Sequence, residues 1–202
     1  MRIFKILTCS IVLLFSMAVN ASTINLSGSW IHDGGSDASD YNVTIDDNTA
    51  GRFTFNVSVT ALALTTDPNT DLLGFFFDAG GNYFSDSDLG ISGSDVTSTG
   101  FNTLSCGKGC NLNGLTSDAF EVGVRIGNNG SPYIPTTTFS INALSGMSLN
   151  DFTRVGVRAQ STGFTGNGSD KAIIFSRVPE PASLLLMSVG LIGLGVMRKK
   201  RK

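Results

Sequence analysis

Apolar and polar residues alternate in several short stretches along the middle of the chain. In RFTFNVSVT, residues 52–60, every second side chain is apolar, and FEVGVRIG, residues 120–127, repeats the pattern. Successive side chains of a β-strand point to opposite faces, so this alternation predicts strands with one buried face. The residues predicted to point inward are Phe53, Phe55, Val57, Val59, Phe120, Val122, Val124 and Ile126.

Three further stretches alternate in the same way: YNVTID (41–46), TFSINA (138–143) and TRVGVRAQ (153–160). Their predicted inward residues are Tyr41, Val43, Ile45, Phe139, Ile141, Ala143, Val155, Val157 and Ala159. Two others, LLGFFFD (72–78) and AIIFS (172–176), are continuously apolar, which suits strands buried more completely.

Turn clusters such as DPNTD, DAGGN, GNNGSP and GNGSD separate seven to nine such strands. The chain therefore predicts an all-β fold, an antiparallel two-sheet β-sandwich of jelly-roll type, rather than an α/β fold. A helical turn is expected near SLNDF, residues 148–152. Between residues 22 and 177, 14 of the 15 acidic residues are Asp, which favours turns over helix interiors.

The first 21 residues have the layout of a secretory signal peptide, with a basic start, an apolar run and small residues at a cleavage point. Signal peptidase would cut after Ala21 and leave Ser22 as the new N-terminus. An uncleaved membrane anchor is the alternative. Export would place the region that follows outside the cytoplasm.

The C-terminus holds an uncharged run from Ala182 to Met197, followed by a basic tail. The run predicts a single transmembrane helix, although sixteen residues span about 24 Å, short of the roughly 30 Å hydrocarbon core. Five consecutive positive charges resist translocation, so the tail stays cytoplasmic and the domain before it lies across the inner membrane. The basic tail is Arg198, Lys199, Lys200, Arg201 and Lys202.

Pro179, Glu180 and Pro181 precede this predicted helix directly. The two prolines prevent the helix from extending upstream, so the segment is expected to be extended and accessible to a protease. The motif, the short Leu/Gly-rich run and the basic end together resemble the PEP-CTERM sorting signals over about 25 residues. The resemblance implies processing by an exosortase of a Gram-negative bacterium that makes extracellular polysaccharide. Release to the cell surface or biofilm matrix would follow. A plain anchor that is never cut is the alternative.

These features divide the chain into a signal peptide (1–21), one β-sandwich domain (22–177) and a sorting signal (178–202). The domain carries seven Lys and Arg against 15 acidic residues, a net charge near −8, although the whole chain has a net charge of −2. Such a domain is not expected to bind nucleic acid through general electrostatics.

Cys106 and Cys110, in CGKGC, are the cysteines left after export. In an oxidising compartment they predict a disulfide rather than a metal site, with free thiols as the alternative. The chain-entropy model gives about 2 kcal/mol for so short a loop, so the bridge is expected to pin a loop more than to hold the fold.

Candidate chemistry is sparse. His32 is the one histidine, no Gly-x-Ser-x-Gly sequence occurs, and no enzyme activity is expected. Asp86 and Asp88, in FSDSDLG, are calcium candidates by the spacing of their oxygens, although the EF-hand pattern fails and solvated turn carboxylates are the alternative. No firm metal site or other cofactor is predicted.

Trp30 and Tyr83 are flanked by polar turns and are the better candidates for a surface that stacks on sugar rings. The leading hypothesis is a secreted, exosortase-sorted envelope or matrix protein with a non-enzymatic structural or interaction role. The alternative is a carbohydrate-binding module that binds extracellular polysaccharide, with or without calcium. A hydrolase is a third class and would need two carboxylates facing a cleft.

Overall fold

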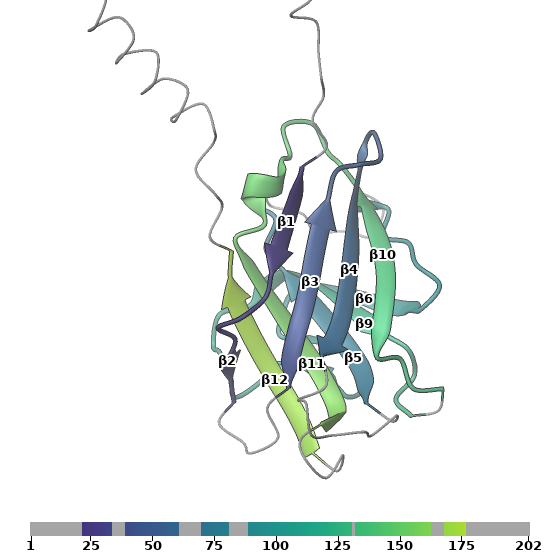
Figure 1. Cartoon of the computed structure of the whole chain (residues 1–202), viewed down its shortest axis with the longest axis vertical. Coiled ribbons are helices and arrows are strands. Elements are labelled where there is room, and N and C mark those ends of the chain that lie inside the picture. The colour runs from purple at the N-terminus through teal and green to yellow at the C-terminus, as the bar shows by residue number, and fades with distance from the viewer. Residues whose placement is uncertain are drawn as a thin grey trace, which may run out of the picture.

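The computed structural model describes residues 22–33, 39–60, 70–80, 89–130, 132–162 and 168–176. These residues form two large antiparallel sheets, seen as two layers in Figure 1, and a small third sheet. The four-stranded sheet has the order β1 (Thr23–Leu26), β3 (Asp40–Asp46), β4 (Arg52–Thr60), β10 (Thr136–Asn142). The six-stranded sheet has the order β2 (Ile31–His32), β12 (Gly168–Phe175), β11 (Arg154–Thr162), β5 (Asp71–Phe77), β9 (Phe120–Ile126), β6 (Val96–Thr103). The prediction of an all-β, antiparallel fold is therefore confirmed, and the jelly-roll assignment stays a prediction.

The alternating stretches form strands that bury the predicted faces. β4 covers the predicted residues 52–60, and its apolar side chains are buried except for the half-buried Val59. Strands β3, β10 and β11 likewise bury their alternating apolar side chains. Each buried apolar side chain contributes about 1.5–3 kcal/mol relative to its exposed state, which fixes the register of these strands.

Five phenylalanine rings form the centre of the core between the two sheets. The Phe55 ring of β4 lies 4.7 Å from that of Phe139 and 5.0 Å from that of Phe77, centroid to centroid. Phe75 and Phe152 pack against the same ring at 5.7 and 5.3 Å. Since these residues come from β4, β10, β5 and the segment before β11, the cluster joins both layers.

The two continuous apolar runs differ in how completely the structure buries them. Every residue of β5 is buried, as predicted. In β12 Ala172 and Ile173 are buried but Phe175 is 56% exposed, so the more complete burial predicted for this run does not extend to its end. The reason is that the neighbouring strand β2 pairs only with Ala172 and Ile173 and leaves the end of β12 at an open edge.

β1 and β2 are two parts of one extended segment that changes sheets between them. β1 pairs with β3 in the four-stranded sheet, whereas β2 pairs with β12 in the six-stranded sheet. The bend lies at Gly28, whose φ of 106° is in the region that favours glycine. The N–H of Trp30 donates to the carbonyl of Gly28 at 2.7 Å and closes the turn.

A 3₁₀ helix, η1 (Leu149–Asp151), forms where the sequence predicts a helical turn. The Asp151 carboxylate accepts a hydrogen bond from the N–H of Ser148 at 2.7 Å and closes its first turn. Within the described residues, no helix is long and apolar enough to cross a membrane. The predicted signal peptide and C-terminal transmembrane helix lie outside the described residues.

Candidate functional site

The predicted functional residues divide between the described domain and the segments outside it. Ala21, Tyr83, the calcium candidates Asp86 and Asp88, and the whole sorting signal 178–202 lie outside the described residues. Ser22, the predicted new N-terminus, directly precedes β1, and its backbone N donates to the Asp47 carboxylate at 2.6 Å.

Trp30 belongs to the core, so its prediction as a surface residue is wrong. Its side chain is 7% exposed, its ring lies edge-on to Tyr41 at 5.3 Å, and its Nε1–H donates to the Tyr41 carbonyl at 3.0 Å. The change of sheets at Gly28 turns Trp30 inward, and the alternation pattern contains no sign of that turn. Trp30 therefore cannot form a sugar-stacking platform with Tyr83.

A buried polar cluster joins β2, β3 and β12 at one edge of the six-stranded sheet. The Asp170 carboxylate is almost fully buried and accepts hydrogen bonds from the Tyr41 hydroxyl at 2.7 Å and from the N–H of Ser39 at 3.0 Å. Nδ1 of His32 lies 3.0 Å from the same carboxylate. The GNGSD cluster predicts a turn that includes Asp170, and no residue pattern in the sequence indicates this buried role.

Burial sets the ionisation of the groups around Asp170. Burial, and then the nearby Asp170 charge, raises the pKa of Tyr41 far above its ordinary value, so its hydroxyl keeps its proton. Burial lowers the pKa of Arg158, whose Nη1 donates to the Asp170 carbonyl at 3.0 Å. The Asp170 carboxylate accepts from Tyr41 and Ser39 and lies 3.0 Å from His32 Nδ1, whereas Nε of Arg158 is buried without a partner among the described residues. These contacts join three strands and indicate a structural role.

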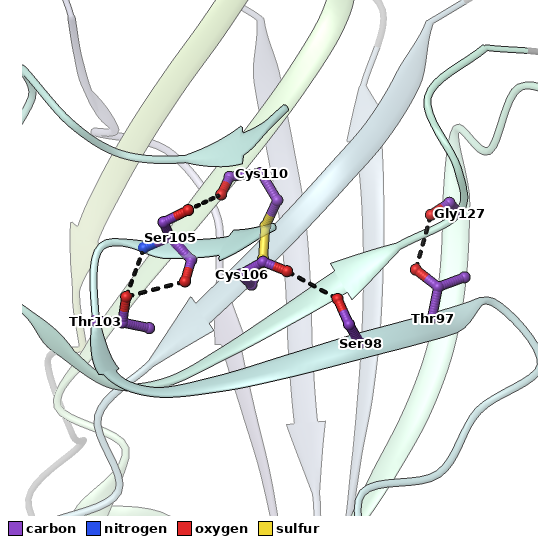
Figure 2. Close-up of a disulfide and its surroundings, with 7 residues drawn as sticks. All are labelled: Thr97, Ser98, Thr103, Ser105, Cys106, Cys110 and Gly127. Carbon is purple, nitrogen blue, oxygen red and sulfur yellow. Dashed lines mark hydrogen bonds between the residues drawn. A yellow bond between two sulfur atoms is a disulfide. The ribbon is translucent and has the colours of Figure 1, made fainter. Parts of the chain in front are cut away.

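The predicted disulfide between Cys106 and Cys110 is confirmed, with Cα atoms 5.3 Å apart. It joins β7 (Ser105–Gly107) to β8 (Cys110–Asn111), and Figure 2 shows hydrogen bonds that hold this hairpin. The Ser98 hydroxyl of β6 donates to the Cys106 carbonyl at 2.8 Å, and the Ser105 hydroxyl donates to the Cys110 carbonyl at 3.2 Å. The hairpin is thus attached to the edge of the six-stranded sheet.

The bridge does more than pin a loop, because both cysteines are buried in a second hydrophobic cluster. This cluster contains Phe76, Cys106, Cys110, Leu112, Phe120 and Ile173. Phe76 points away from the main core, so the cluster lies on the outer face of the six-stranded sheet. Phe120, predicted to face the main core, belongs to this second cluster instead, and its ring lies 5.7 Å from that of Phe76.

Glycines make room for this cluster. Gly156, Phe76, Gly123 and Gly100 form one row across β11, β5, β9 and β6. A Cβ on Gly123 would come within 2.9 Å of the Phe76 ring, and one on Gly156 within 2.5 Å of Leu112. Phe76 therefore covers its glycine neighbours, and the loop around the disulfide lies directly on the sheet.

The outer face of the four-stranded sheet has the opposite character, since every side chain that points outward from it is polar. Strand pairing aligns these side chains in rows, of which one consists of Asn25, Thr44, Asn56 and Thr138. Asn56 Nδ2 donates to the Thr44 hydroxyl at 3.3 Å, and the Thr138 hydroxyl donates to Asn56 Oδ1 at 2.9 Å. The row is therefore an ordered, uncharged array of hydroxyl and amide groups.

Two surface grooves border the segment that changes sheets. The larger encloses about 550 Å³ between β1 and the end of β12, and its lining includes Ile31, Ile174 and Phe175. The smaller, about 310 Å³, lies at the other side of β1 and has one carboxylate, Asp40, in its lining. No group of three or more His, Cys, Asp or Glu residues that could hold a metal ion occurs within the described ranges.

A family model for the PEP-CTERM protein-sorting motif matches residues 177–201. The match begins one residue after Ser176, the last described residue of the domain, and contains the predicted motif Pro179, Glu180 and Pro181. This motif indicates export and exosortase-dependent sorting to the surface of a Gram-negative cell. No curated protein and no solved structure matches the chain.

Proposed function

We propose that this chain is a secreted protein whose β-domain is exported, held briefly at the inner membrane by residues 182–197, and released by an exosortase to the cell surface or extracellular matrix. The match to the sorting motif at residues 177–201 carries this proposal. The position of the strands is compatible with it, because β1 starts at Thr23 and β12 ends at Phe175, between the two predicted processing points.

The disulfide and the two hydrophobic clusters, one between the sheets and one on the outer face of the six-stranded sheet, suit an exported domain. Disulfides form in oxidising compartments, and Cys110 is fully buried beneath the hairpin. A buried bridge resists reduction and keeps the outer face of the six-stranded sheet covered. Such a domain withstands an environment without chaperones, as a matrix or surface protein must.

We propose a structural or interaction role without catalysis. Glycosidases use two carboxylates that face each other across a cleft. Among the residues that the structure describes, the larger groove has no carboxylate in its lining and the smaller has one, which favours a non-enzymatic role over a hydrolase.

Intact mass spectrometry in the native host tests this function. The protein is recovered separately from membranes and from the extracellular matrix. A matrix form that starts at Ser22 and ends near Pro179 to Pro181 is expected. Protein found only in membranes and still carrying Arg198 to Lys202 would instead identify an anchored envelope protein that is never cut.

A second candidate function is contact with a neutral polysaccharide through the outer face of the four-stranded sheet. The ordered row of Asn25, Thr44, Asn56 and Thr138 supports it, since hydroxyl and amide groups can bond to sugar hydroxyls without charge. The test is retention of the processed form on the host's own polysaccharide. Asn56→Ala should reduce retention, whereas Tyr133→Ser, which changes an exposed residue outside this row, should not. Retention that EDTA does not change would exclude a need for calcium.

A further inference from the structure

Two large apolar side chains stand exposed at the point where the chain leaves the domain for the sorting motif. Ile31 is 51% exposed and Phe175 is 56% exposed, and both line the larger groove. Phe175 is the last residue of β12 and lies four residues before Pro179. Groups of exposed apolar side chains on a soluble domain mark interaction sites more often than single ones do.

The groove exists because the chain changes sheets beside it. β2 pairs with Ala172 and Ile173 of β12, and the chain then turns away at Gly28 toward the other sheet. The last part of β12 therefore has a neighbour on one side, β11, and an open edge on the other. The groove runs along this open edge, between it and β1.

The open edge offers backbone groups to an incoming strand. The N–H of Ser176 donates to the Thr153 carbonyl at 2.9 Å, on the β11 side. Backbone groups of successive residues point to opposite sides of a strand, so the N–H and C=O of Phe175 point to the open edge.

The shape and lining of the groove favour an extended peptide over a lipid surface. It is concave, and the polar residues Asn25, Ser27 and Ser29 share its lining with the apolar ones. A peptide that adds to a strand edge bonds through its backbone and places alternate side chains in pockets. A lipid surface would leave the polar lining and the strand edge without hydrogen bonds.

The sorting motif identifies the partner. Four residues of extended chain span at most about 14 Å, so a protease that grips Pro179 lies within that distance of Phe175. The enzyme that recognises the motif is therefore brought close to the groove by the chain's own sequence. We propose that the groove formed by Ile31 and Phe175 binds an extended apolar segment of the processing exosortase, which adds as a strand to the open edge of β12. This inference rests on the proposed function, and extends substrate recognition from the motif into the folded domain.

Processing kinetics in the native host test the groove. Wild type, Ile31→Ser, Phe175→Ser and the double variant are expressed as full chains, and pulse-chase with intact mass follows conversion of the uncut to the cut form. Removing both apolar contacts should slow conversion about tenfold and leave the motif untouched. Tyr133→Ser is the matched control, since Tyr133 is also exposed, at 40%, but does not line the groove. Phe175→Leu, which keeps an apolar side chain, should restore most of the rate.

The outcomes distinguish failure of the groove inference from failure of the proposed sorting function. If wild type is never cut, the proposed function itself fails. If wild type is cut and the double variant is cut at the same rate, the motif alone is recognised and the groove inference is overturned. Thermal unfolding of the processed and uncut forms checks that the variants fold; a slow variant with wild-type unfolding, together with rescue by Phe175→Leu, supports the inference.

Other occupants give different results. Binding of the processed wild type to protein-free phosphatidylcholine vesicles, lost in the double variant, would assign the groove to lipid and overturn the inference. Dimerisation in solution that depends on Ile31 and Phe175 would assign it to a second copy of the chain, with the same consequence.

Discussion

Gly74→Ala tests the idea that glycines allow the disulfide hairpin to lie on the sheet. A Cβ at Gly74 would overlap Sγ of Cys110 and would come within 3.3 Å of Sγ of Cys106. The sulfurs cannot easily retreat, because the Ser98 hydroxyl of β6 holds the Cys106 carbonyl in place (Figure 2). Overpacking of this kind costs about 1–3 kcal/mol. For a domain of this size, the melting temperature should fall by about 2–4 °C for each kcal/mol.

The matched control is the same substitution without the sulfurs. Cys106→Ala with Cys110→Ala removes the bridge, which itself lowers stability by about 2 kcal/mol through loop entropy and by more through lost packing. In that background the new methyl group has room, so Gly74→Ala should cost much less. The free energies of unfolding come from urea denaturation of the four proteins, and the coupling between the two changes should be about 1–3 kcal/mol. Equal costs of Gly74→Ala in both backgrounds would refute the packing argument.

Three other substitutions probe the core and its buried polar groups. Phe55→Ala should cost about 3–5 kcal/mol in urea denaturation, because four rings lose their central partner; a cost below 1 kcal/mol would contradict a packed centre. Asp71→Ala should cost about 1–3 kcal/mol, since the buried Asp71 carboxylate accepts from the N–H groups of Gly130 and Ile134 and from Gln160. Amide exchange around Gly130 should accelerate, and unchanged exchange there would count against this role. The raised pKa of Tyr41 predicts that stability is constant below the ordinary tyrosine pKa of about 10 and falls as pH rises above it, because the unfolded chain then loses a proton that the folded chain keeps. Tyr41→Phe should flatten this fall in urea denaturation at pH 8 and 11, and an unchanged slope would exclude Tyr41 as its source.

Alternation predicted the strands well because it reports a local property, the burial of every second side chain. The five alternating stretches all became strands, and the helical turn appeared near residue 148. Alternation says nothing of which sheet a strand joins. The prediction for Trp30 failed for that reason, since the inward position of its ring depends on a change of sheets at Gly28.

The second cluster was accessible to sequence analysis only in part. Gly74, Gly123 and Gly156 interrupt otherwise apolar strands, and a glycine inside a strand often marks the close approach of other atoms. That signal could have indicated a covered outer face. It could not have identified CGKGC as the segment that covers this face, because the sequence of a segment does not show which distant segment packs against it.

The sorting motif was recognisable from sequence because its parts follow one another within residues 177–201. The groove beside it was not, because Ile31 and Phe175 are 144 positions apart and meet through the pairing of β2 with β12.

The covered and open surfaces of the domain limit where a partner can bind. The outer face of the six-stranded sheet carries the disulfide hairpin, so its backbone is shielded along the row from Gly156 to Gly100. The four-stranded sheet presents a polar face, and the edge beside β1 presents apolar side chains next to the exit of the chain. The apolar edge is needed while the motif is intact, and the polar face is available before and after cleavage. Asn25 belongs both to the polar row and to the lining of the groove, so the two surfaces adjoin at β1. Because Ile31 and Phe175 are not part of the polar row, variants at these two positions should alter the rate of release but leave retention of the released form on polysaccharide unchanged.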